Sequence, residues 1–379
     1  MIYNDLLGKR VSMMGMGLMR LPVLDDTSSK IDEKTAKQMV DYAYEHGVNY
    51  FDTAWGYHGG NSETFIGKAL KDYPRDSFNL VSKFPSYDAS NFGKHEQIFE
   101  KQLEKCQVDY FDFYLLHNIC ETNIEKYMDE EKYGTVAYFL KQKELGRIKH
   151  LGFSVHGNFD IFSRFMERFG DVIEFCQIEL NWFDWSFQDA KAKVDYCNEH
   201  NIPIIVMEPL RGGYLVDLDD EYRAELAAVN PDHSSVEWAF RWLQGIEGVT
   251  VVLSGSSAPE QIEQNIALFE ERKPLTDPEK QALAKIAEKM SHEKGLPCTG
   301  CRYCISHCPV GLDIPYLISL YNEHQTKEAS ESFIAPMAVA ALPADKRPSA
   351  CIACNSCHDV CPQELPIPEY LAEFAAAVE

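Results

Sequence analysis

Two short runs in the last quarter of the chain hold eight of its twelve cysteines. Both runs have the spacing C-x2-C-x2-C-x3-C-P, which is typical of chains that bind 4Fe-4S clusters through thiolates. In such a pair of runs, three cysteines hold one cluster and the fourth, before the proline, reaches the other cluster. We therefore assign one cluster to Cys298, Cys301, Cys304 and Cys361, and the other to Cys351, Cys354, Cys357 and Cys308.

Zinc is the alternative metal for C-x2-C pairs, but zinc sites usually place two such pairs far apart in the chain. The text after each run also repeats, as CPVGLDIP at 308–315 and CPQELPIP at 361–368. Shared positions that are not ligands indicate a duplicated unit. With the helical text at 316–325 between the runs, this region resembles the helical two-cluster ferredoxin modules of larger redox enzymes.

The balance of charge argues against several classes of partner. The chain carries 59 acidic and 36 basic residues, for a formal charge of -23. An acidic surface repels phosphate backbones and anionic lipid, so we expect neither nucleic acid nor membrane as a partner. The first ten residues lack the apolar stretch of a signal peptide, and the apolar runs are short for a membrane span. We expect a cytoplasmic protein with reduced cysteines.

Three polar side chains stand at the ends of apolar runs in the first part of the chain. Asp52 closes VNYFD, Lys83 closes FNLVSK and His117 closes FDFYLLH, while Tyr57 follows Asp52 by five residues. Each residue alone has an ordinary structural explanation. Together, at equivalent ends of consecutive strands, they predict a catalytic group.

The elements that must position these residues alternate regularly. Eight β-rich runs, at 12–21, 48–54, 78–84, 111–117, 148–155, 174–180, 202–209 and 249–255, are separated by helical stretches. This alternation predicts an α/β fold with a closed (β/α)8 TIM barrel over 1–285. A ferredoxin-like domain, small and mainly helical, is expected over 286–379. An open doubly wound sheet is the alternative, but Gly15-x-Gly17 lacks the third glycine of its phosphate fingerprint.

The barrel resembles the aldo-keto reductase family, over about residues 10–270. The matching text is FDTAWGY, LVSK and LLH around the four polar residues, with GLMRLP, GFSVH, QIELN, MEPLRGG and SGSSAPEQIEQN in support. The whole chain resembles the branch of that family with a C-terminal 4Fe-4S ferredoxin-type domain. The resemblance implies an oxidoreductase whose catalytic residues are Asp52, Tyr57, Lys83 and His117.

The implied reaction is hydride transfer between a nicotinamide and a small carbonyl or alcohol substrate. Tyr57 would be the general acid, and we expect the Lys83 ammonium to lower the pKa of its phenol. Asp52 would hold Lys83 charged, and His117 would orient the carbonyl oxygen. Trp55, His58 and Trp182 are either pocket or core residues.

The same resemblance implies a cofactor site, NAD(H) or NADP(H), at the ends of the later strands. Ser154 and Gln177 match positions that hold the carboxamide. The family's nicotinamide-stacking aromatic is Met207 here, the asparagine after Ser154 is Val155, and the two basic 2′-phosphate residues fall on Gly255 and Gln261. These departures make NADH at least as suitable as NADPH and keep a flavin open as an alternative. The full expected contact set is Ser154, Gln177, Met207, Leu210, Gly212, Gly213, Ser254, Gly255, Ser256, Gln261, Gln264 and Asn265.

Several functions remain compatible with this sequence. The first is a nicotinamide-linked carbonyl reductase whose clusters exchange electrons with the active site or with a redox partner protein. The others are a ferredoxin- or flavin-mediated reductase without nicotinamide hydride, an electron-transfer protein with a barrel docking module, and a reductase whose clusters are only structural. Clusters carry single electrons whereas a hydride carries two, and the sequence shows no converter between them.

Overall fold

The computed structural model describes residues 1–24, 29–296, 298, 304–325, 332–361 and 364–379, with 292–294 described as backbone only. The chain divides into two compact units. The first comprises Met1–Arg211 with Asn230–Lys280, and the second comprises Gly212–Val229 with Gln281–Glu379. The expected boundary between residues 285 and 286 places Gly212–Val229 in the first domain, whereas here this segment belongs to the second unit. That segment joins the second unit through Lys289, whose ammonium forms ion pairs with the carboxylates of Glu221 and Glu225.

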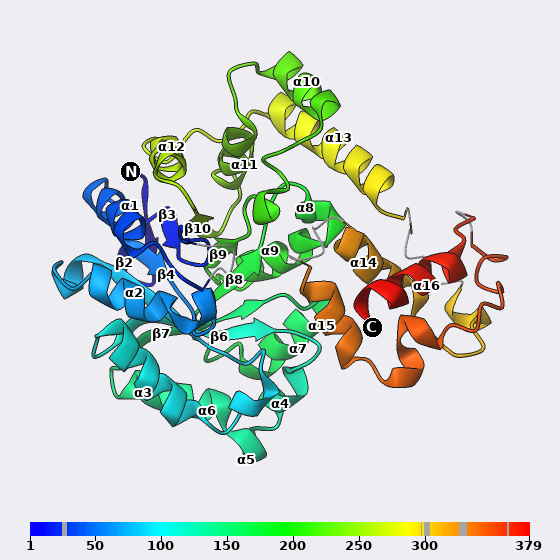
Figure 1. Ribbon diagram of the computed structural model, residues 1–379, viewed down its shortest axis with the longest axis horizontal. Helices are drawn as coiled ribbons and strands as arrows, with labels where there is room; N and C mark the ends of the chain where they lie inside the picture. Colours follow the sequence, from blue (N-terminus) through cyan, green and yellow to red (C-terminus); the bar gives the residue numbers. More distant parts are fainter. Residues whose placement is uncertain (25–28, 297, 299–303, 326–331, 362–363) are drawn as a thin grey trace. The chain divides into compact units, whose positions relative to one another are not determined.

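Eight parallel strands of the first unit close a barrel in the order β10-β3-β4-β5-β6-β7-β8-β9 (Figure 1). This closure confirms the predicted (β/α)8 fold and excludes the open doubly wound sheet. One strand overlaps each of the eight β-rich runs. The bounds are β3 Met14–Gly17, β4 Tyr50–Asp52, β5 Asn79–Phe84, β6 Phe111–Ile119, β7 Ile148–Val155, β8 Phe175–Glu179, β9 Ile204–Met207 and β10 Val249–Gly255.

A short antiparallel hairpin, β1 Tyr3–Leu6 and β2 Lys9–Ser12, precedes the barrel and is absent from the sequence-based prediction. Leu6 and Val11 are fully buried and pack in the same core as interior barrel residues such as Phe113. The hairpin therefore closes one end of the barrel. Two four-residue strands with mostly polar text carry too little periodicity to be recognised from the sequence.

Gly15 explains one motif of the sequence. A Cβ atom at this position would lie 2.9 Å from side-chain atoms of both Leu253 and Val251, and 3.0 Å from Tyr50. The glycine is thus needed for close packing inside the barrel, which accounts for Gly15 in the Gly-x-Gly text.

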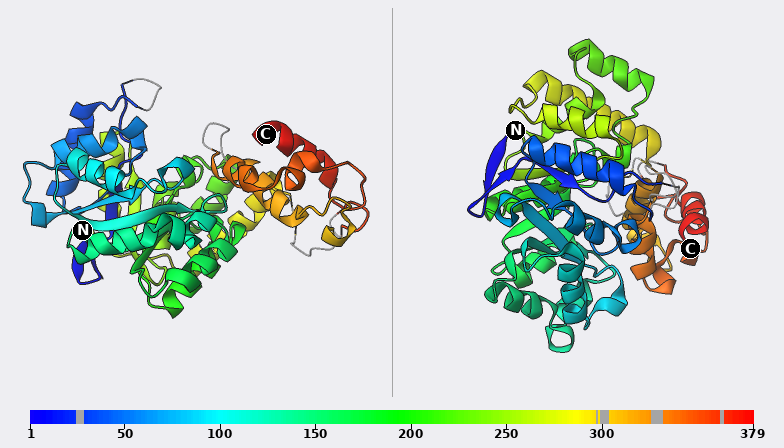
Figure 2. Two further views of the ribbon diagram at one scale, coloured as in Figure 1. Left: turned by 90° about the horizontal axis from the view of Figure 1, so that it is seen from below. Right: turned by 60° about the vertical axis from the view of Figure 1, so that its left-hand side comes forward.

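Helices cover the outside of the barrel in both Figure 1 and Figure 2. Their N-terminal ends carry the expected capping residues: the side chains of Asp32, Asn158 and Ser234 accept hydrogen bonds from backbone N–H groups three residues later. Helix α7, Phe159–Phe169, occupies the expected helical stretch between β7 and β8. The other helices of this unit of at least eight residues are α1 Glu33–Glu45, α2 Ser62–Ala69, α3 His95–Cys106, α6 Thr135–Glu144, α9 Ala190–Glu199, α11 Ser235–Leu243 and α12 Pro259–Leu268.

The second unit is mainly helical. It contains α10 Asp220–Val229, α14 Ile314–Gln325, α15 Ile334–Ala341 and α16 Ile367–Val378, and α13 Asp277–Lys294 leads into it. The repeat found in the sequence has a structural counterpart. Helices α14 and α16 begin at the isoleucine of each C-P-x-x-L-x-I-P motif, and the leucine and isoleucine of both motifs are buried in one core, as Leu312, Ile314, Leu365 and Ile367.

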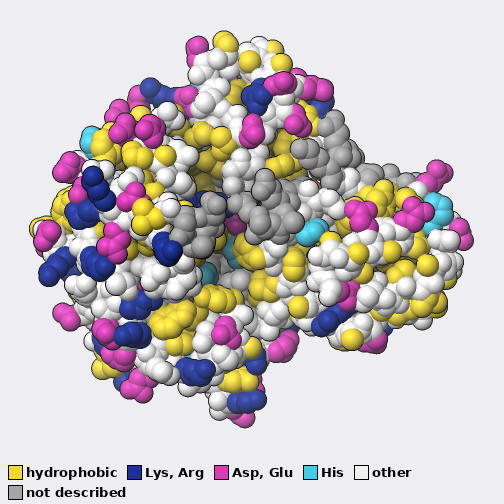
Figure 3. Space-filling view, in the orientation of Figure 1, with side chains coloured by type: hydrophobic (Ala, Val, Ile, Leu, Met, Phe, Trp, Pro, Cys, Tyr) yellow, Lys and Arg dark blue, Asp and Glu magenta, His cyan; other side chains and the backbone are white. Residues whose placement is uncertain are grey.

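On the face drawn in Figure 3, acidic and basic side chains are interspersed over the barrel rather than gathered by sign. None of the described helices combines the length and the apolar character that a membrane span requires.

Candidate functional site

Three neighbouring strands bring the predicted catalytic side chains together. Asp52 ends β4, Lys83 lies near the end of β5 and His117 near the end of β6, and these strands are paired in parallel register. Tyr57 begins the short 3-10 helix that follows β4, Tyr57–Gly60. All four residues therefore lie at the carboxyl ends of the strands, where barrels of this architecture carry their active sites.

Lys83 is the centre of this group. Its ammonium nitrogen donates to Asp52 Oδ1 at 2.5 Å, to the carbonyl oxygen of Thr53 at 2.8 Å and to the Tyr57 hydroxyl at 3.4 Å. The side chains of Lys83 and Asp52 are 0% and 2% exposed. Further hydrogen bonds help to offset the cost of burying an ion pair. The Thr53 carbonyl supplies one to the ammonium, whereas Asp52 Oδ2 has no partner among the described residues.

The pKa values of Lys83 and Asp52 are both raised. Burial pulls the pKa of Lys83 down, but the nearby Asp52 carboxylate and Tyr57 oxygen outweigh it, and the pKa is raised. Burial also raises the pKa of Asp52, an effect that Lys83 offsets only in part. Both shifts keep a proton on the pair, so Lys83 remains a cation beside Tyr57 at neutral pH.

The pKa of Tyr57 departs from the sequence-based expectation. The Lys83 charge does lower it, as expected, but burial of the phenol raises it more, and Asp52 adds to the rise. The net pKa therefore lies above the usual value for tyrosine. The expectation omitted the desolvation of the phenol, which appears only once the side chain is placed. Tyr57 remains protonated at neutral pH, as a proton donor requires.

His117 is held as a neutral imidazole. Burial lowers its pKa well below the usual range, and the Lys83 and His156 charges lower it further. Its ring stands nearly perpendicular to that of Tyr57, at 81° with centroids 6.3 Å apart. Among the residues that the structure describes, His117 Nδ1 has no hydrogen-bond partner. A second tyrosine, Tyr87, lies edge-on to His117 at 5.5 Å and is 40% exposed, a neighbour that the sequence analysis did not identify.

The three aromatic candidates for the pocket wall have separate positions. His58 is buried and its Nε2 accepts the backbone N–H of Leu21 at 3.1 Å, which is a structural contact. The Lys105 ammonium lies 4.7 Å from the Trp55 ring. Trp182 is 3% exposed and lies edge-on to the Phe183 ring.

The expected carboxamide contacts lie side by side on the next strands. Ser154 of β7 is paired in register with Gln177 of β8. The Ser154 hydroxyl accepts the backbone N–H of Asn118 at 2.8 Å, and Gln177 Nε2 lies 3.6 Å from Met207 Sδ. Gln177 Oε1 is buried and has no hydrogen-bond partner within the described part of the chain. A buried acceptor of this kind fits the N–H group of a carboxamide.

The end of β10 and helix α12 form the expected phosphate region. Asn265 Nδ2 donates to Ser254 Oγ at 2.9 Å and to Ser256 Oγ at 3.4 Å. Gln261 and Gln264 are exposed on α12, and Gln261 Oε1 accepts the backbone N–H of Ser257 at 2.8 Å. These contacts hold the hydroxyl groups of Ser254 and Ser256 against helix α12.

An arginine from a different element accompanies this region. A Cβ atom on Gly255 would lie 3.5 Å from Arg20 Cβ and 3.7 Å from its Cγ and Cδ. The Ser257 hydroxyl donates to the Arg20 carbonyl at 2.9 Å and fixes the backbone there. The loop after β3 thus supplies a cation next to Gly255, where alignment along the chain shows no basic residue.

The remaining expected contacts follow β9. Arg211 is 1% exposed, and its Nε donates to Asp184 Oδ2 at 2.9 Å in a buried ion pair that anchors this loop. Leu210 is half-buried. Gly212 and Gly213 both have positive φ, 69° and 107°, and belong to the second unit.

In the second unit, four of the predicted cluster ligands line one pocket. Its walls are Cys308, Cys351, Cys354 and Cys357, together with apolar residues that include Ile314, Pro368 and Leu371. Thus the fourth cysteine of the first run lies with the first three of the second. Cys298, Cys304 and Cys361 pack in or against the same core, and Cys301 lies outside the described residues.

Local backbone geometry prepares these thiols for a metal cluster. The backbone N–H of Leu312 donates to Cys308 Sγ at 3.4 Å, and that of Ala353 to Cys351 Sγ at 3.5 Å. Ala353 and Asn355 both have left-handed backbones, with φ of 53° and 61°, and such strain is typical of functional loops. Hydrogen bonds to the sulfurs are a recognised feature of iron–sulfur sites. The pocket therefore fits a 4Fe-4S cluster.

The family model for the aldo/keto reductase family matches residues 13–288, more than half of the chain. The chain belongs to this family. A second model, of the 4Fe-4S dicluster domain, matches residues 297–365. The chain is therefore an aldo/keto reductase with a C-terminal dicluster domain, as its sequence motifs indicated.

Individual relatives of this aldo/keto reductase are distant. It is 25% identical over 303 residues to the uncharacterized oxidoreductase YqkF of Bacillus subtilis. This alignment covers 72% of this chain and 92% of that protein. It is 21% identical to the NADH-specific methylglyoxal reductase of Escherichia coli, over 74% and 96% of the two chains. A match to probable aldo-keto reductase 1 of Glycine max, at 26% identity, covers 55% of this chain and 58% of that protein.

Solved structures agree on the fold. Aldo-keto reductase AKR11C1 from Bacillus halodurans, in its holo form, superposes with a TM-score of 0.62 at 24% identity, over 76% of this chain and 96% of that one. An aldo-keto reductase from Klebsiella pneumoniae in complex with NADPH gives a TM-score of 0.59 at 20% identity, over 76% and 96%. At these identities the likeness shows the barrel fold alone.

Proposed function

We propose that this aldo/keto reductase interconverts a small carbonyl compound and its alcohol, with Tyr57 as general acid and base. The observation that carries the proposal is the contact of Lys83 with both Asp52 and the Tyr57 hydroxyl. As a carbonyl is reduced, negative charge develops on its oxygen. A protonated phenol with a fixed cation behind it can donate its proton to that oxygen, and the cation then stabilises the phenolate that remains.

His117 would position the substrate. A neutral imidazole is a hydrogen-bond donor at one nitrogen and an acceptor at the other. Because its lowered pKa keeps His117 neutral, it can orient the carbonyl oxygen without competing with Tyr57 as the acid. Tyr87, edge-on to His117 and partly exposed, would shape the entry to this pocket.

A bound nicotinamide would supply or accept the hydride. Ser154 and the buried Gln177 Oε1 would hold its carboxamide, and the hydroxyl groups of Ser254 and Ser256 would face the phosphates, with Arg20 as the nearby cation. Similar proteins support this cofactor class, since one relative is named an NADH-specific methylglyoxal reductase and one similar structure is a complex with NADPH. The loss of a stacking aromatic at Met207 is compensated in part by its thioether, which fills space adaptably.

The dicluster domain would hold two 4Fe-4S clusters, which exchange single electrons. Cys308, Cys351, Cys354 and Cys357 would bind one, with the other held by Cys298, Cys301, Cys304 and Cys361. We infer that the clusters connect the active site with a redox partner protein.

Two measurements test this proposal on protein with reconstituted clusters. Small aldehydes and ketones, methylglyoxal among them, are offered with NADH and then NADPH, for wild type, Tyr57→Phe and the matched control Tyr87→Phe. We expect Tyr57→Phe to lose about 10²- to 10⁴-fold in rate while its cluster absorbance is unchanged, and Tyr87→Phe to keep most of its activity. Equal rates for wild type and Tyr57→Phe would exclude the proposed acid.

The second measurement follows the clusters themselves. Cluster absorbance is recorded anaerobically after addition of NADH or NADPH alone. Bleaching would link nicotinamide oxidation to cluster reduction, as proposed. Normal carbonyl reduction without bleaching, retained in Cys354→Ser, would make the clusters structural instead.

The ferredoxin- or flavin-mediated reductase is the second candidate, and one observation favours it. Met207 replaces the stacking aromatic expected beside a nicotinamide. A flavin spectrum in freshly isolated protein, or carbonyl reduction driven by reduced ferredoxin but not by NADH or NADPH, would decide for this candidate.

A further inference from the structure

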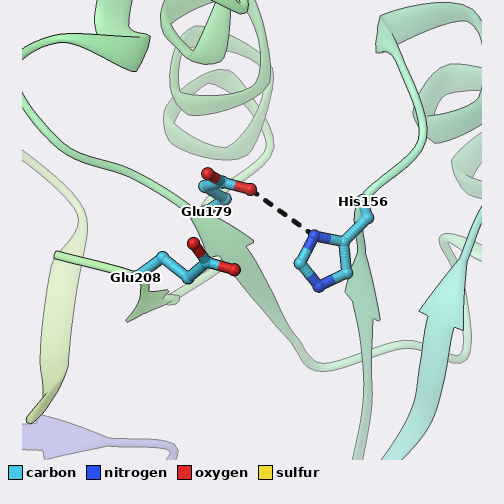
Figure 4. Close-up of side chains that lie close together, drawn as sticks. All are labelled: His156, Glu179 and Glu208. Atoms are coloured by element: carbon cyan, nitrogen blue, oxygen red, sulfur yellow. Dashed lines mark ion pairs between the residues drawn. The ribbon is translucent and has the colours of Figure 1, made fainter. Parts of the chain in front are cut away.

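Three side chains at the ends of successive barrel strands converge beside the catalytic group. His156 follows β7, Glu179 ends β8 and Glu208 follows β9. One donor atom of each lies within 4.8 Å of a donor atom of the other two, and His156 Nδ1 is 3.5 Å from Glu179 Oε2. Figure 4 shows the three side chains directed toward one another from their separate strands.

The barrel holds this cluster rigidly and largely away from water. The side chains of His156 and Glu179 are 9% and 6% exposed. Glu208 has a left-handed backbone, with φ of 51°, and its carbonyl oxygen accepts a hydrogen bond from Asn181 Nδ2 at 3.2 Å. Asn181 in turn donates to Asp184, the partner of the buried Arg211. The loop that presents Glu208 is therefore fixed on both sides.

We propose that His156, Glu179 and Glu208 form a binding site for a divalent transition-metal ion. Two carboxylates and one imidazole are the mixed oxygen and nitrogen donors that ions such as Zn²⁺, Mn²⁺ and Fe²⁺ accept. Ligands about 2.0–2.2 Å from an ion lie roughly 3–4 Å apart. The donor atoms lie within 4.8 Å of one another, so small rotations of the two flexible glutamate side chains would bring them to that distance.

The position of the site relates it to the reaction. His156 and Glu179 each follow an expected carboxamide contact, Ser154 or Gln177, by two residues, and Glu208 follows Met207 directly. The charge of Glu208 acts on Tyr57, whose pKa is raised chiefly by burial and in small part by Glu208. The His156 charge likewise adds to the lowering of the His117 pKa that burial causes. Three protein ligands leave coordination positions open, as catalytic sites do, and, resting on the proposed function, we infer that they accept oxygen atoms of the substrate.

Lys193 is the competing explanation for the two carboxylates. Burial lowers its pKa, the Glu179 charge opposes that shift, and its ammonium donates to the carbonyl oxygen of Gly157 at 2.7 Å. If the Lys193 charge alone neutralised Glu179, or if the two carboxylates bound an ammonium group of a substrate, the protein would bind no metal ion.

Mn²⁺ is the probe for the direct test, because the free ion has a strong electron paramagnetic resonance signal that is lost on binding. Protein with reconstituted, oxidised clusters is titrated with Mn²⁺, and Zn²⁺ is then added as a competitor. We expect one Mn²⁺ bound per chain and released by Zn²⁺. Glu179→Gln and Glu208→Gln should each weaken binding by about 100-fold or more, since even partners of metal ligands contribute 10- to 100-fold.

The chain offers two matched controls. Glu174 lies beside His150 at 3.1 Å, before the start of β8 and with Lys143 as its ion-pair partner. Glu174→Gln removes the same charge from a similar pair and should bind Mn²⁺ as wild type does. Tyr57→Phe should also bind Mn²⁺ normally, so that a failure of the proposed carbonyl chemistry is distinct from a failure of the metal site.

The nitrogen ligand has its own signature. Electron spin echo modulation of bound Mn²⁺ should show imidazole nitrogen in the wild type and lose it in His156→Gln, with folding checked by circular dichroism and cluster absorbance. This comparison tests the proposed metal site even if a glutamate variant fails to fold. Absence of Mn²⁺ binding by the wild type, or binding unchanged in all three ligand variants, would overturn the proposal.

Discussion

The Lys83 ammonium lies 2.5 Å from Asp52 Oδ1 and 3.4 Å from the Tyr57 hydroxyl, in surroundings where both members of the ion pair are almost completely buried. This relationship joins the stability of the barrel to its chemistry. The cation that polarises the phenol is also a buried charge that the protein must balance. Variants of the pair should therefore affect folding and activity together.

Asp52→Asn should leave Lys83 buried without its charge partner. Removal of one member of a buried ion pair typically costs about 3–5 kcal/mol, so we expect a marked fall in the free energy of unfolding. The double variant Asp52→Asn with Lys83→Met removes both charges and should recover part of that loss. Urea unfolding of the two single variants and the double variant measures this coupling. Strictly additive losses would show that the pair is not energetically coupled.

Arg20 should decide between the two nicotinamide cofactors. Its side chain lies against Gly255 at the expected phosphate region, and guanidinium groups bind phosphate well. Arg20→Ala should raise the KM for NADPH about tenfold, while the KM for NADH changes little. A matched control is Arg10→Ala, on the β1–β2 hairpin. An equal change for both cofactors would place Arg20 away from the 2′-phosphate.

The stability of the barrel should depend on Glu174 at neutral pH but not in acid. Burial raises the pKa of this carboxyl, but the hydrogen bonds from His150, Lys143 and the Leu151 N–H outweigh it and lower the pKa to about 2. A carboxyl whose folded pKa is depressed stabilises the fold above its unfolded pKa, and that contribution is lost as pH falls toward the folded value.

Glu174→Gln should therefore cost about 1–3 kcal/mol at pH 7, allowing for partial exposure, and progressively less between pH 4.5 and pH 2. The measurement is the difference in unfolding free energy between variant and wild type at each pH, in which contributions from the clusters cancel. The same difference at pH 7 and pH 3 would contradict the assigned pKa.

Cys308 should affect the cluster of the second cysteine run, although it belongs to the first. It lines one pocket with Cys351, Cys354 and Cys357. Cys308→Ser and Cys351→Ser should alter the same electron paramagnetic resonance signal of the reduced protein, whereas Cys298→Ser should alter the other. If Cys308→Ser instead changed the signal that Cys298→Ser changes, the ligands would not cross between runs.

The sequence predicted those parts of the site that depend on one element at a time. Asp52, Lys83 and His117 each end an apolar run, and once the barrel closes, the ends of parallel strands meet at one rim. The β1–β2 hairpin was missed because it is short and polar.

Relationships between distant elements could not be predicted in the same way. Arg20 reaches Gly255 because of the register in which β10 pairs with β3, and the sequence does not give that register. The cluster of His156, Glu179 and Glu208 depends on the register of three strands and on a left-handed backbone at Glu208. The raised pKa of Tyr57 depends on burial, which the sequence does not quantify.

The transfer of deuterium from NADH or NADPH labelled at C4 of the nicotinamide tests the account most directly. Wild-type protein is supplied with its best carbonyl substrate, and the alcohol is analysed by mass spectrometry. The account predicts one deuterium at the former carbonyl carbon, formed about 10²- to 10⁴-fold more slowly by Tyr57→Phe. An alcohol without deuterium, or full-rate transfer by Tyr57→Phe, would contradict it.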